Sequence, residues 1–143
     1  LRFFDKEAIM IGGGYKHRMS LNDMVMIKDN HLLITNSMEG IIKSARKRHK
    51  HVEVEVENQR DAILAASSGA TIVMLDNFSP VQIKKTIAAL QKKKLRNKVK
   101  LEASGGINSK NIAAYTKTGV DMISVGSITN SVSGLDLSLE VCV

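Results

Sequence analysis

The chain has 143 residues, of which 43% are hydrophobic and 24% charged, and its formal net charge is +7. This length and composition favour one folded domain with a single core and exclude a disordered chain. The longest apolar runs, such as Thr71–Leu75, have the length of a strand and fall far short of the roughly 20 residues of a membrane span, so we expect no membrane partner.

Positive charge attracts nucleic acids and small anionic substrates alike, so the net charge does not choose between them. The chain has only three Phe, two Tyr and no Trp, which leaves few platforms for stacking bases, and we expect no nucleic-acid partner. The single cysteine, Cys142, provides neither a disulfide framework nor a CxxC metal site, which fits a reducing, cytoplasmic location.

From Asp23 onward, short apolar runs alternate with amphipathic segments of helical length, which is typical of βαβ units and a parallel sheet. The expected elements, in chain order, are strand Val25–Lys28, helix Met38–His49, strand Val52–Val56, helix Gln59–Ser67, strand Thr71–Leu75, helix Pro80–Lys93, strand Val99–Leu101, helix Ser109–Thr118, strand Met122–Val125 and a sixth strand Leu135–Leu139. A complete eight-fold barrel takes about 250 residues, so the fold class is α/β, a partial or open TIM-like β/α barrel with about six parallel strands.

Three local patterns have plain structural interpretations. Ser79 is expected to cap the helix that begins at Pro80. The basic run Arg46–His51 is interpreted as the solvated last turn of a helix, with a nucleic-acid patch as the alternative. The glycine run 12–14 is by default a helix stop, or it belongs with the cations that follow it.

Polar or glycine-rich tips follow the expected strands. They are Asp29-Asn30-His31, Glu57-Asn58, Asp76-Asn77, Ser104-Gly105-Gly106 and Gly126-Ser127. Ligands bind at the C-terminal edge of a parallel sheet, because strand ends and helix N-termini converge there. The alignment of these tips indicates an enzyme.

Three sets of residues in or near these tips could bind anionic ligands or a metal. The cations His17, Arg18 and Lys28 suit a carboxylate or dicarboxylate. By the two-residue period of a strand, Glu55 and Glu57 share one face. With Asp76 they could hold Mg²⁺ on a pyrophosphate, although a half-exposed strand and a helix cap are the plain alternatives.

The third set consists of the late glycine loops, Ser104–Gly106 and Gly126-Ser127. Glycines let backbone N–H groups approach a phosphate at a helix N-terminus, so the two loops predict phosphate binding. Two ordinary tight turns are the alternative.

Five strings occur in uninterrupted order: GGGYKHRMSLNDMVMIKDNHL, VEVEVEN, VMLDN, LEASGGI and GVDMISVGSITNS. Together they resemble the barrel domain of quinolinate phosphoribosyltransferases, from about Leu1 to the chain end. The resemblance implies that this chain is most of the catalytic barrel, and that an N-terminal α/β sandwich domain and a first barrel strand precede it. It also implies a homodimer with an active site shared between subunits, so we expect the chain alone to be inactive.

Residue roles follow from the resemblance position by position. His17, Arg18 and Lys28 correspond to ligands of the quinolinate carboxylates, and Glu57 and Asp76 to the carboxylates that meet the ribose hydroxyls and Mg²⁺. The positions that correspond to the ribose 5′-phosphate site are Ser104, Gly105, Gly106, Gly126 and Ser127. Asn130 stands where the family has histidine, and an amide donates a hydrogen bond but carries no charge.

The implied activity is that of a pentosyltransferase in NAD biosynthesis. Quinolinate displaces pyrophosphate from phosphoribosyl pyrophosphate and is decarboxylated, giving nicotinate mononucleotide and CO₂, with Lys28, Glu57 and Asp76 as catalytic residues. Three alternatives stay open: a relative of this fold associated with molybdenum transport, an inactive anion-binding fragment, and a basic nucleic-acid binder. Retained His17, Arg18 and Lys28 argue against the first.

Overall fold

A computed structural model describes residues 2–16, 24–28, 30–31, 37–130, 134 and 136–141. Five parallel strands form one sheet within these ranges, in the order β1-β2-β3-β4-β5. The strands are β1 (Val25–Ile27), β2 (Val52–Val56), β3 (Ile72–Asp76), β4 (Lys100–Ser104) and β5 (Met122–Ile123). The helices are α1 (Arg2–Ile11), α3 (Met38–Arg48), α4 (Gln59–Ser68), α5 (Pro80–Lys92), the 3₁₀ helix η1 (Arg96–Lys98), α6 (Ile112–Tyr115) and α7 (Ser127–Asn130).

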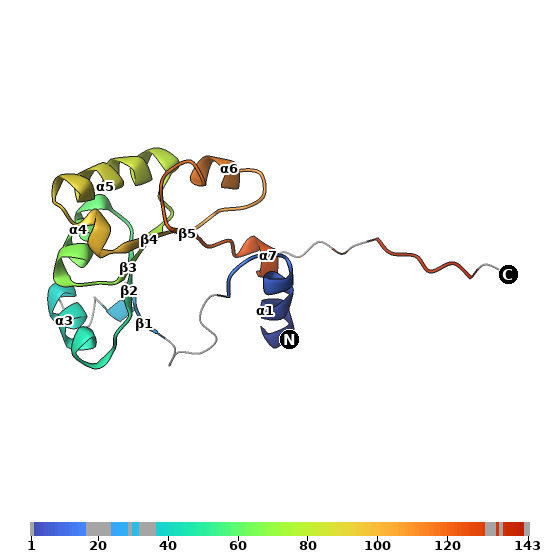
Figure 1. Cartoon of the computed structure of the whole chain (residues 1–143), viewed down its shortest axis with the longest axis horizontal. Coiled ribbons are helices and arrows are strands. Elements are labelled where there is room, and N and C mark those ends of the chain that lie inside the picture. The colour runs from blue at the N-terminus through green and yellow to red at the C-terminus, as the bar shows by residue number, and fades with distance from the viewer. Residues whose placement is uncertain are drawn as a thin grey trace.

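The sheet adds each new strand beside the previous one. A doubly wound sheet would reverse its order part-way, whereas a β/α barrel continues in one direction. Figure 1 shows α3, α4 and α5 along one side of the sheet and α1 on the other. The α/β fold expected from the sequence is therefore confirmed, as an open segment of a β/α barrel.

The sheet has five strands in the described residues instead of about six, because residues 136–139 of the expected strand Leu135–Leu139 are not in a strand. Residues 136–139 have no regular structure, and Leu137 and Leu139 are 83% and 94% exposed. Their alternation of apolar and polar residues is typical of a half-buried strand, but a strand also needs a neighbour to pair with.

Local sequence signals set most helix ends. Ser79 and Gln82 form a capping box at the start of α5, with Pro80 in its first turn. Helix α4 ends at Gly69, whose φ of 101° favours glycine. The Gly12–Gly14 run ends α1, so the helix-stop interpretation is confirmed.

Helix α6 is much shorter than the expected Ser109–Thr118. The backbone N–H of Asn108 donates to Asn111 Oδ1 at 2.9 Å, and the N–H of Lys110 donates to Asn108 Oδ1 at 2.9 Å. These side-chain bonds offer the backbone an alternative to the helix, which therefore starts only at Ile112.

The hydrophobic core lies between the sheet and the helices that cover it. Val54, Val73 and Leu101 on the strands are fully buried, as are Ile83 and Leu90 of α5. By contrast, residues 46–51 are exposed around the end of α3, as expected for a solvated last turn. Within the described ranges we find no helix long and apolar enough to cross a membrane.

Candidate active site

The strand register aligns polar side chains at the C-terminal edge of the sheet. Val56 pairs with Leu75, so Glu57 lies at the register position beside Asp76, and Asp76 pairs with Ser104. The next row inward joins Glu55 to Met74 and Met74 to Glu102. Both rows lie on the face opposite the valines of β2, because successive side chains alternate between faces. The sheet therefore presents carboxylates toward the interior of the barrel.

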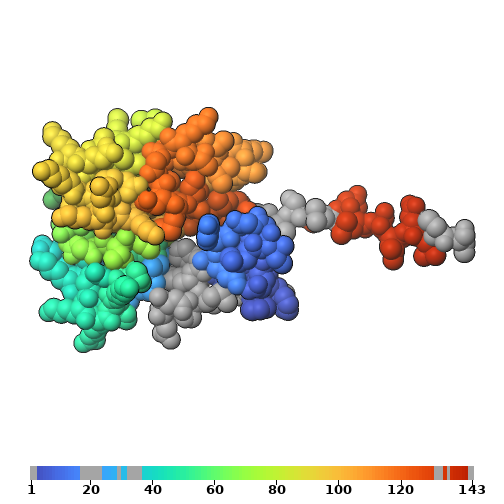
Figure 2. Space-filling model, viewed as in Figure 1, coloured from blue at the N-terminus to red at the C-terminus, as the bar shows by residue number. Residues whose placement is uncertain are grey.

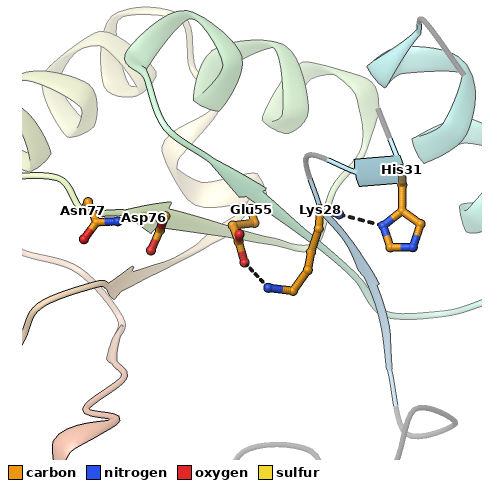
Figure 3. A network of polar contacts seen from close by, with 5 residues as sticks. All are labelled: Lys28, His31, Glu55, Asp76 and Asn77. Atoms are coloured by element: carbon orange, nitrogen blue, oxygen red, sulfur yellow. Dashed lines mark hydrogen bonds and ion pairs between the residues drawn. The ribbon is translucent and has the colours of Figure 1, made fainter. Parts of the chain in front are cut away.

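Lys28 forms an ion pair with Glu55 across the first two strands. The Lys28 Nζ and Glu55 Oε2 atoms are 2.7 Å apart, and the Lys28 backbone N–H donates to His31 Nδ1 at 3.1 Å. Figure 3 shows Lys28, Glu55 and Asp76 projecting from the same side of the sheet. The Lys28 side chain is 44% exposed, so its ammonium group is accessible to an anionic ligand.

The two late glycine loops line a single cavity of about 410 Å³. Its wall consists of Ser104, Gly105, Gly106, Ile107, Asn108, Ser124, Gly126, Ser127 and Asn130. Two loops that are 20 residues apart in the chain meet here, where the Ser127 hydroxyl donates to the Ile107 carbonyl at 3.4 Å. The cavity thus gathers backbone amides and hydroxyl groups beside the carboxylate row.

Comparison with known proteins identifies the family. The family model described as quinolinate phosphoribosyl transferase, C-terminal domain, matches residues 1–140. The chain belongs to this family. A probable nicotinate-nucleotide pyrophosphorylase [carboxylating] from Methanothermobacter thermautotrophicus is 49% identical over 99% of the chain and 52% of its own length. The Rattus norvegicus nicotinate-nucleotide pyrophosphorylase [carboxylating] is 40% identical over 98% of the chain and 47% of its own length.

The crystal structure of NadC from Streptococcus pyogenes superimposes with a TM-score of 0.87 at 39% identity, covering 98% of the chain and 48% of that protein. The chain therefore spans about half the length of the relatives it matches. The fold that we infer from the strand order is thus also that of a solved family structure.

Most of the residues singled out in the sequence of this family member lie at one edge of the sheet. Ser104, Gly105, Gly106, Gly126, Ser127 and Asn130 all line the cavity. Lys28, Glu57 and Asp76 follow or end the neighbouring strands. Ser79 rather than Asp76 caps α5, so the alternative role of Asp76 as a helix cap is wrong. His17 and Arg18 lie outside the described residues.

Glycine in the first loop is required by close contact. Gly105 has a φ of 87°, and a Cβ atom there would lie 2.6 Å from the backbone nitrogen of Asn77. Gly106 has a φ of 63°. The loop leads into the Asn108–Asn111 turn, and the helix that was expected from Ser109 starts only at Ile112, so Gly106 is not directly followed by a helix. Gly126 does directly precede α7.

Sequence reasoning missed the buried acids on the interior face. Glu53 is fully buried and Glu102 is 2% exposed, and the Glu102 carboxylate accepts a hydrogen bond from the Ser124 hydroxyl. The signal for Glu102 was present: the two-residue period places it on the same face as Ser104. It was missed because the expected strand ended at Leu101, whereas β4 continues to Ser104.

The carboxylates at the C-terminal edge of the sheet suit Mg²⁺ only when a substrate phosphate provides further metal ligands. Among the residues that the structure describes, no group of three or more His, Cys, Asp and Glu side chains could hold a metal ion. Mg²⁺ is commonly bound by one or two carboxylates together with substrate phosphates and water. The adjacent Glu57 and Asp76 fit that kind of site.

Proposed function

We propose that this chain supplies the barrel part of a quinolinate phosphoribosyltransferase, which converts quinolinate and phosphoribosyl pyrophosphate to nicotinate mononucleotide, pyrophosphate and CO₂ in NAD biosynthesis. The observation that carries the proposal is the cavity between the two glycine loops, which lies beside Glu57 and Asp76 on one sheet edge. A substrate with a 5′-phosphate, ribose hydroxyls and a pyrophosphate needs hydrogen-bond donors for its phosphate close to carboxylates that meet its hydroxyls. The names of the relatives support this reaction.

The proposed reaction has two steps. The pyridine nitrogen forms a bond to the ribose anomeric carbon, while the bond from that carbon to the pyrophosphate oxygen breaks and pyrophosphate leaves with the electron pair. The carboxylate next to the nitrogen then leaves as CO₂, and the carbon that keeps the electron pair takes up a proton. Neither step needs a covalent nucleophile from the protein.

The residue roles follow from the family resemblance, and the positions of the described residues support them. Lys28, with His17 and Arg18, binds the two quinolinate carboxylates and orients the ring. Glu57 and Asp76 contact the ribose hydroxyls and favour the positive charge that develops on the sugar. They would also hold Mg²⁺, which supplies positive charge to the pyrophosphate when bound. The backbone and hydroxyl groups of the cavity, with the Asn130 amide, bind the 5′-phosphate.

Turnover is the direct test of the proposal. The full-length protein is incubated with both substrates, with and without Mg²⁺, and the release of CO₂ and nicotinate mononucleotide is measured. Release that requires quinolinate, phosphoribosyl pyrophosphate and Mg²⁺ is the expected result. Phosphate binding without turnover would favour the anion-binding alternative, and no turnover with quinolinate would overturn the proposal.

Phosphate binding tests the cavity separately. Inorganic phosphate should raise the melting temperature of the wild-type protein in a saturating way, as expected for one site. Gly105→Val should abolish the increase, since its Cβ would meet Asn77 and a β-branched residue disfavours a φ of 87°. Chloride at matched ionic strength is the control. An equal increase with chloride, or one that survives the substitution, would contradict a phosphate site here.

The proposal includes a homodimer that shares its active sites, located in the cytoplasm and without a nucleic-acid or membrane partner. The exposed apolar side chains of α1 support a protein partner: Phe3, Phe4 and Ile11 are 58%, 70% and 87% exposed. Light scattering on the full-length protein should give twice the monomer mass. A monomer with full activity would contradict the shared site.

A further inference from the structure

Asn77, which directly follows Asp76 at the end of β3, has an unusual backbone conformation. Its φ is 55°, a left-handed value that only one other described non-glycine residue adopts, Lys94 with a φ of 56°. This conformation costs energy for a residue with a Cβ, although Asn tolerates it better than most. The backbone N–H of Asn77 donates to the carbonyl of Ser104 at 2.9 Å. The turn thus ties the end of β3 to the end of β4.

The Asn77 side chain lies between two parts of the site. On one side, its Nδ2 donates a hydrogen bond to Asp76 Oδ2 at 2.8 Å, and Figure 3 shows the two side chains next to each other. On the other side, its Oδ1 faces Gly105 so closely that a Cβ there would lie 2.3 Å away. One amide group therefore contacts both the carboxylate and the glycine loop.

We infer that Asn77 is a positioning residue, which holds the Asp76 carboxylate at a fixed place relative to the loop Ser104–Gly106. The inference rests on the proposed function, in which these two groups bind the ribose and the 5′-phosphate of one molecule. Because both groups must meet the same substrate at once, a change in their spacing weakens its binding and leaves quinolinate binding nearly unchanged. Asn77 itself acts through Asp76 and Gly105 and does not touch the reacting atoms.

Two substitutions in the full-length enzyme separate the side chain from the backbone. Asn77→Gly keeps the left-handed turn and the N–H bond to Ser104 but removes the amide. It should raise the KM for phosphoribosyl pyrophosphate about tenfold, since a hydrogen bond to a charged group is lost. The KM for quinolinate should stay within about twofold, as no contact with its proposed ligands changes.

Asn77→Asp keeps the shape but places a second carboxylate 2.8 Å from Asp76 Oδ2. A carboxylate cannot donate the hydrogen bond to Asp76 and repels its charge, so the KM for phosphoribosyl pyrophosphate should rise at least as much as in Asn77→Gly. A purely structural role would lower the melting temperature and leave the ratio of the two KM values as in the wild type.

Lys94→Gly is the matched control, because it relieves the same backbone strain on a residue with no part in the site. It should leave both KM values unchanged. An unchanged KM for phosphoribosyl pyrophosphate in either folded variant, Asn77→Gly or Asn77→Asp, would overturn the inference. Should Asn77→Gly fail to fold, Asn77→Asp decides alone.

The two proposals can fail separately. Turnover of the wild-type enzyme reports on the proposed function, and the ratio of variant to wild type reports on Asn77. If the wild-type enzyme shows no turnover, the affinities of both proteins for inorganic phosphate are compared by calorimetry instead. Asn77→Gly should bind phosphate several-fold more weakly than the wild type, because Gly105 loses its neighbour. Equal affinities, or no binding by either protein, would overturn the positioning role.

Discussion

The two faces of the sheet differ in chemistry although the same strands supply both. In β2, the three valines face the helices and are buried, whereas Glu53 and Glu55 face the barrel interior. Figure 2 shows the teal, green and gold surfaces of residues from α3 to η1 packed together at the left of the molecule, over the helix-covered face. A carboxylate away from water is costly unless it is paired. The acids on the interior face therefore indicate a ligand-binding surface, while the valines on the other face stabilise the fold.

The largest effect is expected on the helix-covered face. Leu101 is fully buried, so Leu101→Ala should lower the free energy of unfolding by about 2–5 kcal/mol through lost burial and a new cavity. Glu55→Gln on the interior face is the matched control, and its half-exposed ion pair should contribute less than about 1 kcal/mol. Urea unfolding of both variants measures the difference. Equal decreases in the free energy of unfolding would contradict the distinction between a stabilising face and a binding face.

On the interior face, Lys28→Ala in the full-length enzyme should weaken quinolinate binding far more than phosphoribosyl pyrophosphate binding. Loss of a charged partner costs roughly 1.5–3 kcal/mol, about 10- to 150-fold in affinity. The substitution also leaves Glu55 without its ammonium partner, so an anionic ligand would meet an uncompensated negative charge. Titration calorimetry with each substrate measures the two affinities, and equal weakening of both would contradict the assignment.

Glu57 and Asp76 lie at adjacent register positions, so their effects on catalysis should be coupled. We expect the double substitution to cost less than the sum of the singles, by about 0.5–3 kcal/mol in transition-state free energy. Steady-state kinetics on the two singles and the double give this value. Strict additivity would mean that the two carboxylates do not share a ligand.

The smallest effect is expected on the solvent side of α3, which belongs to neither sheet face. Lys43 donates to Glu39 at 2.5 Å, and this hydrogen bond and charge lower the pKa of the Glu39 carboxyl. The pair therefore stabilises the fold above the ordinary pKa of glutamate, and the contribution is lost as the pH falls through the lowered pKa. Lys43→Ala should cause a slight loss in melting temperature at pH 7 and none once acid has protonated the Glu39 carboxyl. A loss that persists in acid would point to packing instead.

The sequence by itself determined the features that depend on near neighbours in the chain. The two-residue period of VEVEV separated valines from glutamates, Ser79 and Pro80 marked the start of α5, and the glycine run marked the end of α1. These signals are local, because alternation and capping involve residues a few positions apart. The alternation of expected strands and helices also placed the polar tips at one edge of a parallel sheet.

Only the tertiary structure decided which of those tips meet and which strands form. The pairing of Lys28 with Glu55, the approach of Gly105 to Asn77 and the joining of the two glycine loops each depend on the register between strands, which no local pattern specifies. The same reason explains why residues 136–139 of the expected strand Leu135–Leu139 form no strand, although their alternation is typical of one. A strand is stable only where another strand satisfies its backbone hydrogen bonds, and residues 136–139 have no such neighbour among the residues that the structure describes.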